Sequence, residues 1–212
     1  MLNEKLQSYL NDLTPERPEL LSEMEKYANA HQVPIMELVG IEALLQLLRI
    51  QQPNTILEVG TAIGYSALRM AYVLPNTKIV TIERDAERYE VAEKFIERAQ
   101  KEDQILIIKG DALEVEEEIK THAPYDMVFI DAAKGQYQRF FEMYSKYLQP
   151  SGIIITDNVL FKGLVCEDHI ENKRIRSLVG KIDAFNQWLM NHEDYSTVIL
   201  PVGDGVAISK KR

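Results

Sequence analysis

Short apolar segments that alternate with helical patterns constrain the fold of this chain more than any other feature. Five segments rich in β-branched residues are candidate strands, and each of the first four is followed by a helically spaced stretch. The candidate strands are Thr55–Val59, Lys78–Glu83, Ile105–Lys109, Asp126–Asp131 and Gly152–Asp157. The helical patterns between them are Tyr65–Leu74, Ala86–Gln100, Leu113–Lys120 and Tyr137–Leu148. This alternation predicts a parallel sheet with helices on both faces.

Helices are predicted before this core, and a hairpin is predicted after it. Helical spacing covers residues 6–13, 18–30 and 34–50, and Pro53-Asn54 is a stop signal. After a long helix over residues 173–190, the strands Thr197–Pro201 and Val206–Lys210 flank a glycine-containing turn. We therefore predict a single α/β domain over residues 1–212, with N-terminal helices over residues 1–50 and the core over residues 55–212.

Composition and charge limit the classes of function. A length of 212 residues suits one domain. The net charge of −9, from 24 Lys and Arg against 33 Asp and Glu, argues against a protein that coats nucleic acid without specificity. Cys166 is the single cysteine, so no intramolecular disulfide forms. No apolar run approaches the roughly 20 residues of a membrane helix, and no signal-peptide core is present, so we expect a cytoplasmic protein without a membrane partner.

Acidic residues mark the ends of all five predicted parallel strands. In an open parallel sheet, ligands bind outside the carboxyl ends of the strands. An acidic rim at this edge can bind a ribose, an adenine amine and a metal ion. The acids are Glu58, Glu83, Asp111, Asp131 and Asp157.

The first strand runs into a glycine-spaced turn, Gly60-Thr61-Ala62-Ile63-Gly64. It is not the dinucleotide fingerprint, because Ala62 stands where that motif has its second glycine, and no Lys-Ser/Thr follows as in a Walker A loop. Alone, the turn could be a plain connection between strand and helix. Glu83 lies about 20 residues further on, where an acid accepts ribose hydroxyls, so the two features together favour a nucleoside ligand.

Longer stretches resemble a known family of enzymes. E-V-G-T-A-I-G-Y-S, T-I-E-R and G-D-A resemble class I S-adenosylmethionine-dependent methyltransferases. F-I-D-A-A-K-G-Q-Y and I-I-I-T-D-N-V-L-F-K-G are similar to the divalent-cation-dependent O-methyltransferases, which include catechol and caffeoyl-CoA O-methyltransferases. The resemblance covers essentially the whole chain. It implies the Rossmann-like methyltransferase fold with a mostly parallel seven-stranded sheet, S-adenosylmethionine as cofactor, and Mg²⁺, with Mn²⁺ or Ca²⁺ as alternatives.

The resemblance also implies which residues bind the cofactor. In simpler interpretations, Met36 is a core residue and Ser66 belongs only to its helix. The implied cofactor-binding residues are Met36, Gly60, Tyr65, Ser66, Glu83, Asp111, Ala112 and Asp131.

By the same resemblance, Asp131, Asp157 and Asn158 are the metal ligands, and Lys134 with Asp131 is catalytic. Two carboxylates and an amide are hard oxygen donors that suit Mg²⁺, Mn²⁺ or Ca²⁺, and they leave about half of an octahedron open. The alternative for Asp157-Asn158 is an ordinary turn after the strand. Lys134 stands at a predicted helix start, a poor place for a positive charge, which favours a role as a base.

Three further stretches of the sequence bear on the acceptor. D-A-A-K-G-Q-Y, D-N-V-L-F-K-G-L-V and W-L-M-N-H most resemble the bacterial members that methylate 5-hydroxyuridine at the tRNA wobble position to give 5-methoxyuridine. A small catechol-like acceptor is the alternative. Four basic residues are candidate tRNA contacts or simply a solvated helix face, namely Lys173, Arg174, Arg176 and Lys181. Tyr137 and Phe161 could stack on a base, or they could be core residues.

Two other classes of protein compete with this interpretation. An NAD-binding oxidoreductase is disfavoured by the missing second glycine and by the Asp157-Asn158 pair. A binding module that has lost catalysis is disfavoured because Asp131, Lys134 and the Asp157-Asn158 pair are all present. The family is often dimeric, so we also expect a homodimer.

Overall fold

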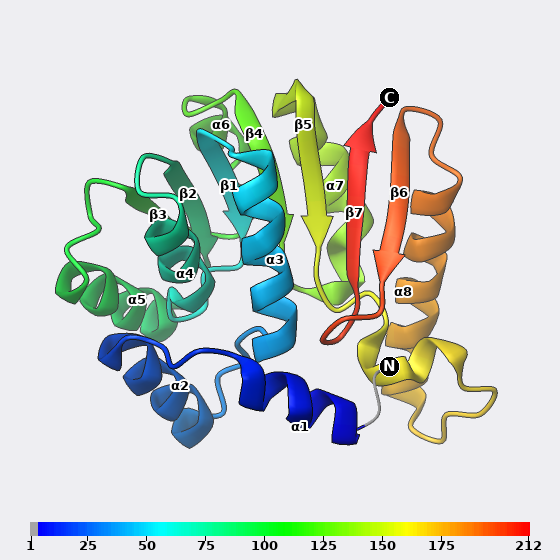
Figure 1. Cartoon of the computed structure of the whole chain (residues 1–212). Coiled ribbons are helices and arrows are strands. Elements are labelled where there is room, and N and C mark those ends of the chain that lie inside the picture. The colour runs from blue at the N-terminus through cyan, green and yellow to red at the C-terminus, as the bar shows by residue number, and fades with distance from the viewer. Residues whose placement is uncertain (1–3) are drawn as a thin grey trace.

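A seven-stranded β-sheet lies at the centre of the computed structural model, which describes residues 4–212. Strands β1 to β5 are parallel, and β7 is antiparallel to both of its neighbours, β5 and β6. The order across the sheet is β3-β2-β1-β4-β5-β7-β6. The predicted α/β fold, with its mostly parallel sheet and C-terminal antiparallel hairpin, is confirmed (Figure 1). The strands are β1 (Thr55–Val59), β2 (Lys78–Glu83), β3 (Ile105–Lys109), β4 (Tyr125–Ile130), β5 (Leu148–Thr156), β6 (Tyr195–Leu200) and β7 (Val206–Lys211).

Helices cover both faces of the sheet. The apolar core is divided accordingly into one cluster that includes residues of α2 to α5 and a second cluster that includes residues of α6 to α8. Along β1, Ile56 belongs to the first cluster, whereas Leu57 and Val59 belong to the second, as the two-residue period of a strand requires. The helices are α1 (Glu4–Leu13), α2 (Glu19–His31), α3 (Leu38–Gln51), α4 (Tyr65–Val73), α5 (Ala86–Arg98), α6 (Glu116–Lys120), α7 (Tyr137–Tyr144) and α8 (Lys173–Met190).

The first three strands and α8 have the predicted bounds, and several other elements differ. Helix α6 begins three residues later than predicted because Asp111 forms a turn, in which its Oδ1 accepts a hydrogen bond from the amide of Leu113 (2.9 Å). Strand β5 begins four residues earlier than predicted, at Leu148, which pairs with Tyr125 of β4. Strand β6 ends before Pro201, which has no amide hydrogen to donate to the ladder.

The third N-terminal helix also begins later than predicted, so Met36 lies in a loop rather than in a helix. Glu37 is the N-cap in extended conformation (φ −60°, ψ 147°), and α3 starts at Leu38. Position 37 lacks a Ser, Thr, Asp or Asn, so the sequence offered no cap signal and Pro34 was taken as the boundary. The loop of residues 33–37 therefore connects α2 to α3.

The N-terminal helices lie across one edge of the sheet. Figure 1 shows α1 and α2 beside the edge at which the parallel strands end. Residues 1–3 of the predicted N-terminal helical region lie outside the described residues. Within residues 4–212, no helix combines the length and apolarity that crossing a membrane requires.

Candidate active site

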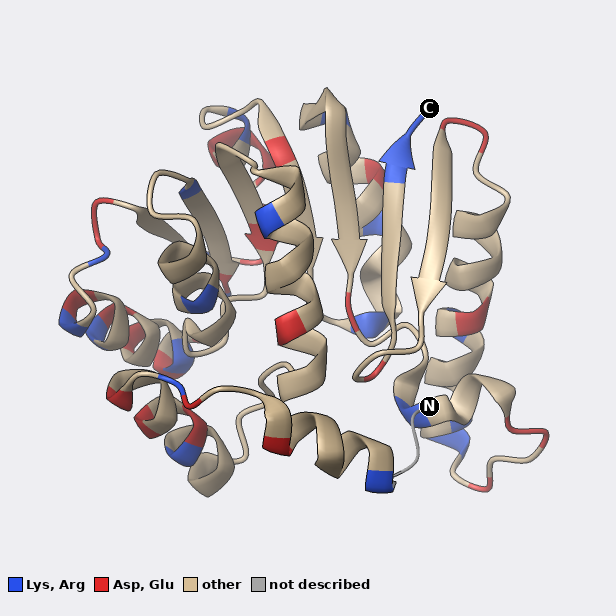
Figure 2. Cartoon of the chain, in the orientation of Figure 1, with Lys and Arg blue, Asp and Glu red and all other residues tan. Residues whose placement is uncertain are grey.

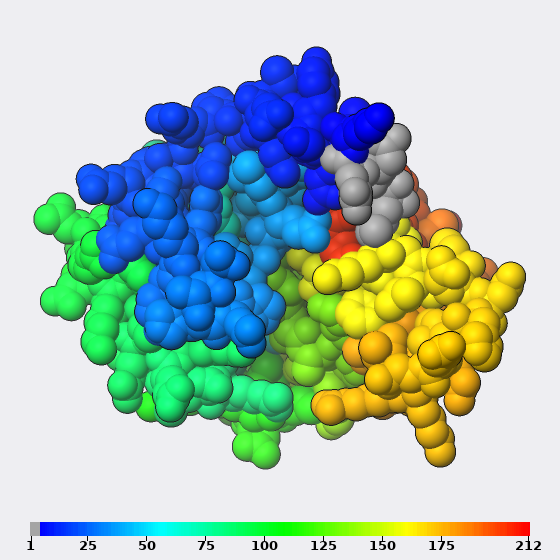
Figure 3. Space-filling view, turned by 90° about the horizontal axis from the view of Figure 1, so that it is seen from below, coloured from blue at the N-terminus to red at the C-terminus, as the bar shows by residue number. Residues whose placement is uncertain are grey.

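A cavity of about 570 Å³ opens at the carboxyl ends of the parallel strands. Its walls are the loop of residues 33–37, the turns after β1 to β5 and the loop between β6 and β7. Seen from this edge, the surface is hollowed between the N-terminal helices and the segment after β5 (Figure 3). The cavity brings together all of the predicted cofactor, metal and catalytic residues, which are Met36, Gly60, Tyr65, Ser66, Glu83, Asp111, Ala112, Asp131, Lys134, Asp157 and Asn158.

Gly60 allows the first turn to approach the end of β4 closely. Its φ is 107°, and a Cβ placed there would lie 2.0 Å from the carbonyl oxygen of Asp131. The turn is also bonded to β2, because the amides of Gly60 and Thr61 both donate to the carbonyl of Ile82 (3.2 and 3.1 Å). A side chain at position 60 would thus push the cavity walls apart.

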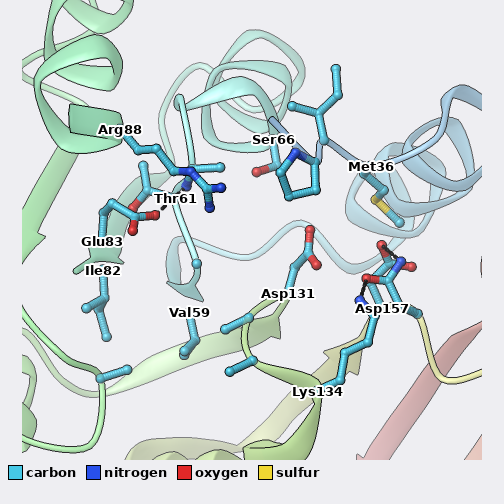
Figure 4. A pocket seen from close by; sticks show the side chains of 18 of the residues that line it. Met36, Val59, Thr61, Ser66, Ile82, Glu83, Arg88, Asp131, Lys134 and Asp157 are labelled. Atoms are coloured by element: carbon cyan, nitrogen blue, oxygen red, sulfur yellow. Dashed lines mark hydrogen bonds between the residues drawn. The ribbon is translucent and has the colours of Figure 1, made fainter. Parts of the chain in front are cut away.

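Glu83 is held at one end of the cavity by two backbone amides. Its Oε2 accepts a hydrogen bond from Ala62 N (2.8 Å), and its Oε1 accepts one from Asp85 N (2.8 Å). Figure 4 shows Glu83 and Arg88 at this end, with Asp131 between them and Asp157. The carboxylate is therefore fixed before any ligand arrives, and its remaining lone pairs can accept hydroxyl donors.

The hydroxyls of Tyr65 and Ser66 bond away from the cavity that these residues line. The Ser66 hydroxyl donates to Glu58 Oε1 (2.5 Å), and the Tyr65 hydroxyl donates to Glu25 Oε1 (2.6 Å). Glu58 also accepts from Thr81 (2.5 Å), and it is fully buried rather than part of the expected acidic rim. It lies below the rim, where the hydroxyls of Ser66 on α4 and Thr81 on β2 donate to its two carboxylate oxygens.

Two carboxylates and an amide meet at the other end of the cavity. Asp131 and Asp157 follow the adjacent strands β4 and β5, and Asn158 comes next, in a left-handed conformation (φ 57°). Burial raises the pKa of Asp131, although Lys134 opposes the shift. Burial and the charge of Asp131 raise the pKa of Asp157 well above its usual range. These neighbouring acids would be stabilised as carboxylates by a cation between them.

Lys134 takes part in this acid cluster. Its ammonium donates a hydrogen bond to Asn158 Oδ1, and the Asn158 amide donates to Asp157 Oδ2 (3.1 Å). Within residues 4–212, no group of three or more His, Cys, Asp or Glu side chains is arranged to hold a metal. A metal site here therefore depends on the amide oxygen of Asn158 as the third protein donor, and hard oxygen donors of this kind suit Mg²⁺.

Sequence reasoning missed several polar residues of the cavity, among them Arg88 and Asp204. Asp204, from the loop between β6 and β7, accepts a hydrogen bond from the amide of Lys162. It thereby holds three successive residues in left-handed conformation, Phe161 (φ 44°), Lys162 (φ 56°) and Gly163 (φ 79°). The sequence P-V-G-D-G near the C-terminus could have indicated that Asp204 lies at the site. No sequence pattern indicated that Arg88 lines the cavity.

The predicted basic cluster lies outside the cavity, on the exposed side of α8. All four residues, Lys173, Arg174, Arg176 and Lys181, are exposed. Figure 2 shows the positive charge at the start of this helix. Lys181 is the one that approaches the site, since its Nζ lies 3.7 Å from the Cβ position of Gly135, beside Lys134. Of the two predicted stacking residues, Phe161 lines the cavity, whereas Tyr137 is buried and its hydroxyl bonds to the carbonyl of Asp157 (2.9 Å).

Comparison with known proteins gives consistent matches. The family model described as O-methyltransferase matches residues 11–212. The catechol O-methyltransferase of Niastella koreensis is 34% identical, over 94% of this chain and 96% of that protein. Caffeoyl-CoA O-methyltransferase 1 of Arabidopsis thaliana is 30% identical, over 93% of this chain and 80% of that protein.

Solved structures agree with these matches. A Staphylococcus aureus protein with the provisional name caffeoyl-CoA O-methyltransferase superposes with a TM-score of 0.93 at 36% identity, covering 99% of this chain and 100% of that one. An O-methyltransferase from Bacillus cereus in complex with SAH superposes with a TM-score of 0.83 at 27% identity, covering 98% and 97% of the two chains.

Proposed function

The chain belongs to the O-methyltransferase family, and on that premise we propose that it transfers a methyl group from S-adenosylmethionine to a hydroxyl of a small catechol-like acceptor, with a divalent cation. The observation that carries the proposal is the pairing of two features in one cavity. A carboxylate fixed by two amides, Glu83, lies at one end, and the acids Asp131 and Asp157 lie with Asn158 at the other. The first can hold a nucleoside, and the second can hold a cation.

Glu83 would accept hydrogen bonds from the ribose hydroxyls of the methyl donor. Asp111, after β3, also lines the cavity and would lie against the adenine. Gly60 and the backbone of Tyr65 and Ser66 would line the methionine part. The SAH complex of the Bacillus cereus relative supports a ligand of this class.

Asp131, Asp157 and Asn158 fit a hard divalent cation, both in donor type and because the two acids repel each other. When bound, such an ion would lower the pKa of an acceptor hydroxyl and orient two adjacent oxygens. The acceptor oxygen would then attack the methyl carbon in line, so that a C–O bond forms as the C–S bond breaks. Lys134 would take up the hydroxyl proton from its neutral amine form, after its ammonium has lost a proton to solvent.

The names of the relatives favour a small aromatic acceptor. The Niastella koreensis protein is a catechol O-methyltransferase, and a Vitis vinifera protein 30% identical to this chain is a flavonoid 3′,5′-methyltransferase. For this chain, a free catechol with two adjacent hydroxyls is accordingly the first acceptor to test.

5-Hydroxyuridine in tRNA is the second candidate, and one observation favours it. The exposed basic residues of α8 begin beside the cavity, with Lys181 close to the segment of Lys134. Such residues can neutralise phosphates of a bound RNA. A homodimer and a cytoplasmic location also belong to the proposal, and sizing chromatography and cell fractionation test them.

The test is methyl transfer from labelled S-adenosylmethionine to a simple catechol and, in parallel, to tRNA that carries 5-hydroxyuridine. We expect label in the catechol, lost with chelator and restored by Mg²⁺ or Mn²⁺. Asp157→Ala should lose this activity, whereas Asp183→Ala, a change of an exposed acid on α8, should keep it. Label found only in tRNA would show that the acceptor is 5-hydroxyuridine in tRNA rather than a catechol. Undiminished transfer after chelation and dialysis would refute the role of the cation.

A further inference from the structure

A chain of hydrogen-bonded charges links the N-terminal helices to the floor of the cavity. Glu25 on α2 binds Arg17 in bidentate geometry, with both N–O distances 2.9 Å. Its Oε1 also accepts the hydroxyl of Tyr65 (2.6 Å). Arg69 of α4 donates to the same hydroxyl (2.9 Å) and to Glu42 of α3. Glu25 thus contacts the hydroxyl of Tyr65 directly, and Arg17 and Glu42 are linked to it through Glu25 and Arg69.

Two members of this network are buried, and the other three, including Glu42 with a side chain 32% exposed, are partly exposed. Tyr65 is 3% exposed, and the side chain of Arg69 is 7% exposed. The side chains of Arg17 and Glu25 are 23% and 25% exposed. Burial alone would raise the pKa of Glu25, but the hydrogen bonds from Arg17 and Tyr65 together lower it, so the carboxylate is ionised. Hydrogen bonds to such a partly buried charge are among the stronger ones in proteins.

The network joins two walls of the cavity. Tyr65 is the first residue of α4, so its backbone and that of Ser66 line the floor. Glu25 lies on α2, and the loop of residues 33–37 follows this helix directly. Pro34, Ile35, Met36 and Glu37 of that loop line the opposite wall. The distance between floor and wall therefore depends on how α2 is docked onto Tyr65.

Apolar packing alone does not fix this docking. The buried residues of α2 are Leu21, Met24 and Ala28, and Leu20 and Tyr27 pack against the same core. Apolar contacts of this kind are non-directional. Hydrogen bonds to a single hydroxyl are directional and therefore restrain the position of the helix more sharply. In Figure 4, Met36 projects toward the end of the cavity that holds Asp157, so a displaced wall would leave that end open.

We propose that Glu25 is a positioning residue for the methyl donor, which holds the loop of residues 33–37 over the cavity through its hydrogen bond to Tyr65. The identity of the donor rests on the proposed function. Without the bond, a smaller fraction of the molecules has the loop of residues 33–37 closed over the cavity. The apparent dissociation constant for the methyl donor rises in inverse proportion to that fraction. The kcat at saturating methyl donor changes little, because binding of the donor favours the conformation in which the loop of residues 33–37 covers the cavity.

The test compares four variants. Glu25→Ala and Tyr65→Phe each remove the bond, and Glu25→Gln keeps an acceptor for the tyrosine hydroxyl. Glu23→Ala is the matched control on the same helix, because Glu23 ties α2 to α5 through an exposed bidentate pair with Arg98 (2.7 and 2.5 Å). Calorimetry measures the affinity for S-adenosylhomocysteine, and steady-state kinetics separate KM for the donor from kcat.

Glu25→Ala and Tyr65→Phe should each weaken binding about tenfold, which matches the loss of one charge-assisted hydrogen bond. The double variant should lose less affinity than the product of the two single losses, since both changes remove the bond between Glu25 and Tyr65. Glu25→Gln should recover most of the affinity, and Glu23→Ala should stay within twofold of wild type. Wild-type affinity in Glu25→Ala, or an equal loss in Glu23→Ala, would overturn the proposal.

A second readout does not depend on the donor. Hydrogen exchange of the peptide covering residues 32–40 should be at least tenfold faster in Glu25→Ala than in Glu23→Ala. Equal exchange in the two variants would refute the positioning role. A wild-type chain that binds no S-adenosylhomocysteine would refute the proposed function, while the exchange rates would still decide the role of Glu25.

Discussion

Glu58 places an ionisable group at the centre of the fold, where its protonation affects stability. Burial raises the pKa of Glu58 to about 7, against 4.5 in its ordinary state, even though Ser66 and Thr81 donate hydrogen bonds to it. The folded chain thus keeps a proton that the unfolded chain has lost. Its contribution to stability is therefore full below about pH 4.5 and falls as the pH rises to about 7, by ~3 kcal/mol.

Glu58→Gln imitates the protonated side chain at every pH, so the variant and wild type should differ in how their free energy of unfolding depends on pH. Urea unfolding at pH 5 should give free energies for the variant and wild type that differ by less than about 1 kcal/mol. At pH 8 the variant should be more stable by ~3 kcal/mol, because it has no charge to bury. Parallel pH profiles for the two proteins would contradict the raised pKa of Glu58.

Lys134 competes with a cation for the same oxygen. Its ammonium bonds to Asn158 Oδ1, which is the third donor in the proposed metal site. Lys134→Met should therefore raise the affinity for Mn²⁺ severalfold, because a competing charge is gone, while turnover falls by about 10² to 10⁴ with the loss of a base. Titration calorimetry and initial rates measure the two effects. The control, Lys181→Met, removes a nearby charge and should change neither the Mn²⁺ affinity nor the turnover by more than twofold. A lower Mn²⁺ affinity in Lys134→Met would refute the competition between lysine and cation.

These residues also mark the limit of what the sequence predicts. The strand-end acids Glu83, Asp131 and Asp157 were predicted to meet, because parallel strands end at one edge, and they do line one cavity. Glu58 was placed on the same rim by the same rule, yet it is buried. Its partners Ser66 and Thr81 belong to other segments, and no local pattern shows that hydroxyls will meet a carboxylate inside the core.

At the scale of elements, the glycine turn after β1 packs closely against the end of β4. Gly60→Ala would force a residue with a Cβ into a left-handed φ. That Cβ would lie 2.0 Å from the carbonyl oxygen of Asp131, a backbone atom that cannot move aside without disturbing the sheet. We expect a loss of about 2–5 kcal/mol in the free energy of unfolding, measured in urea. Gly180→Ala in α8 is the control, because a Cβ there meets nothing within 4 Å. It should stabilise the protein by about 0.5–1 kcal/mol, and equal effects of both changes would refute the close approach.

Element type was more predictable than element position. Strand β1 and helix α8 have clear apolar patterns and strong stop or cap signals, including Asn172, whose side chain accepts from the amides of Arg174 and Ile175. The start of α3 had no such cap, and residues 34–37 of the loop were assigned to the helix. That loop became a cavity wall only through contacts with distant segments, such as the approach of Gly203, whose Cβ position lies 3.9 Å from the Cβ of Glu37.

On the scale of the whole molecule, the site is assembled from both ends of the chain. The loop of residues 33–37 comes from the N-terminal helices, and Asp204 comes from the hairpin that closes the sheet. Between them, the strand ends supply the acids. Alternating patterns predicted the strand ends because topology rules bring them together, whereas the contributions of the two chain ends depend on packing that no short pattern encodes.

The charge distribution of the whole molecule separates the two candidate acceptors. The net charge of −9 repels a polyanion, so RNA would bind only through the local basic residues of α8. A neutral catechol releases no counterions, and its kcat/KM should change less than twofold between roughly 50 and 200 mM salt. If four lysines and arginines neutralised tRNA phosphates, the same fourfold rise in salt would cost about 50-fold in affinity.

Charge reversal on α8 completes this test. Arg174→Glu combined with Arg176→Glu should leave catechol turnover within twofold of wild type, because a neutral acceptor gains nothing from those charges. Arg49→Glu combined with Lys120→Glu makes the same change of net charge on elements that end at the opposite edge of the sheet, before β1 and β4. If only the α8 variant loses methyl transfer, and the loss appears with tRNA and follows the steep salt dependence, the acceptor is the RNA. If the two variants transfer methyl groups equally well to every acceptor, the basic residues of α8 are a solvated helix face. This outcome supports a catechol as the acceptor.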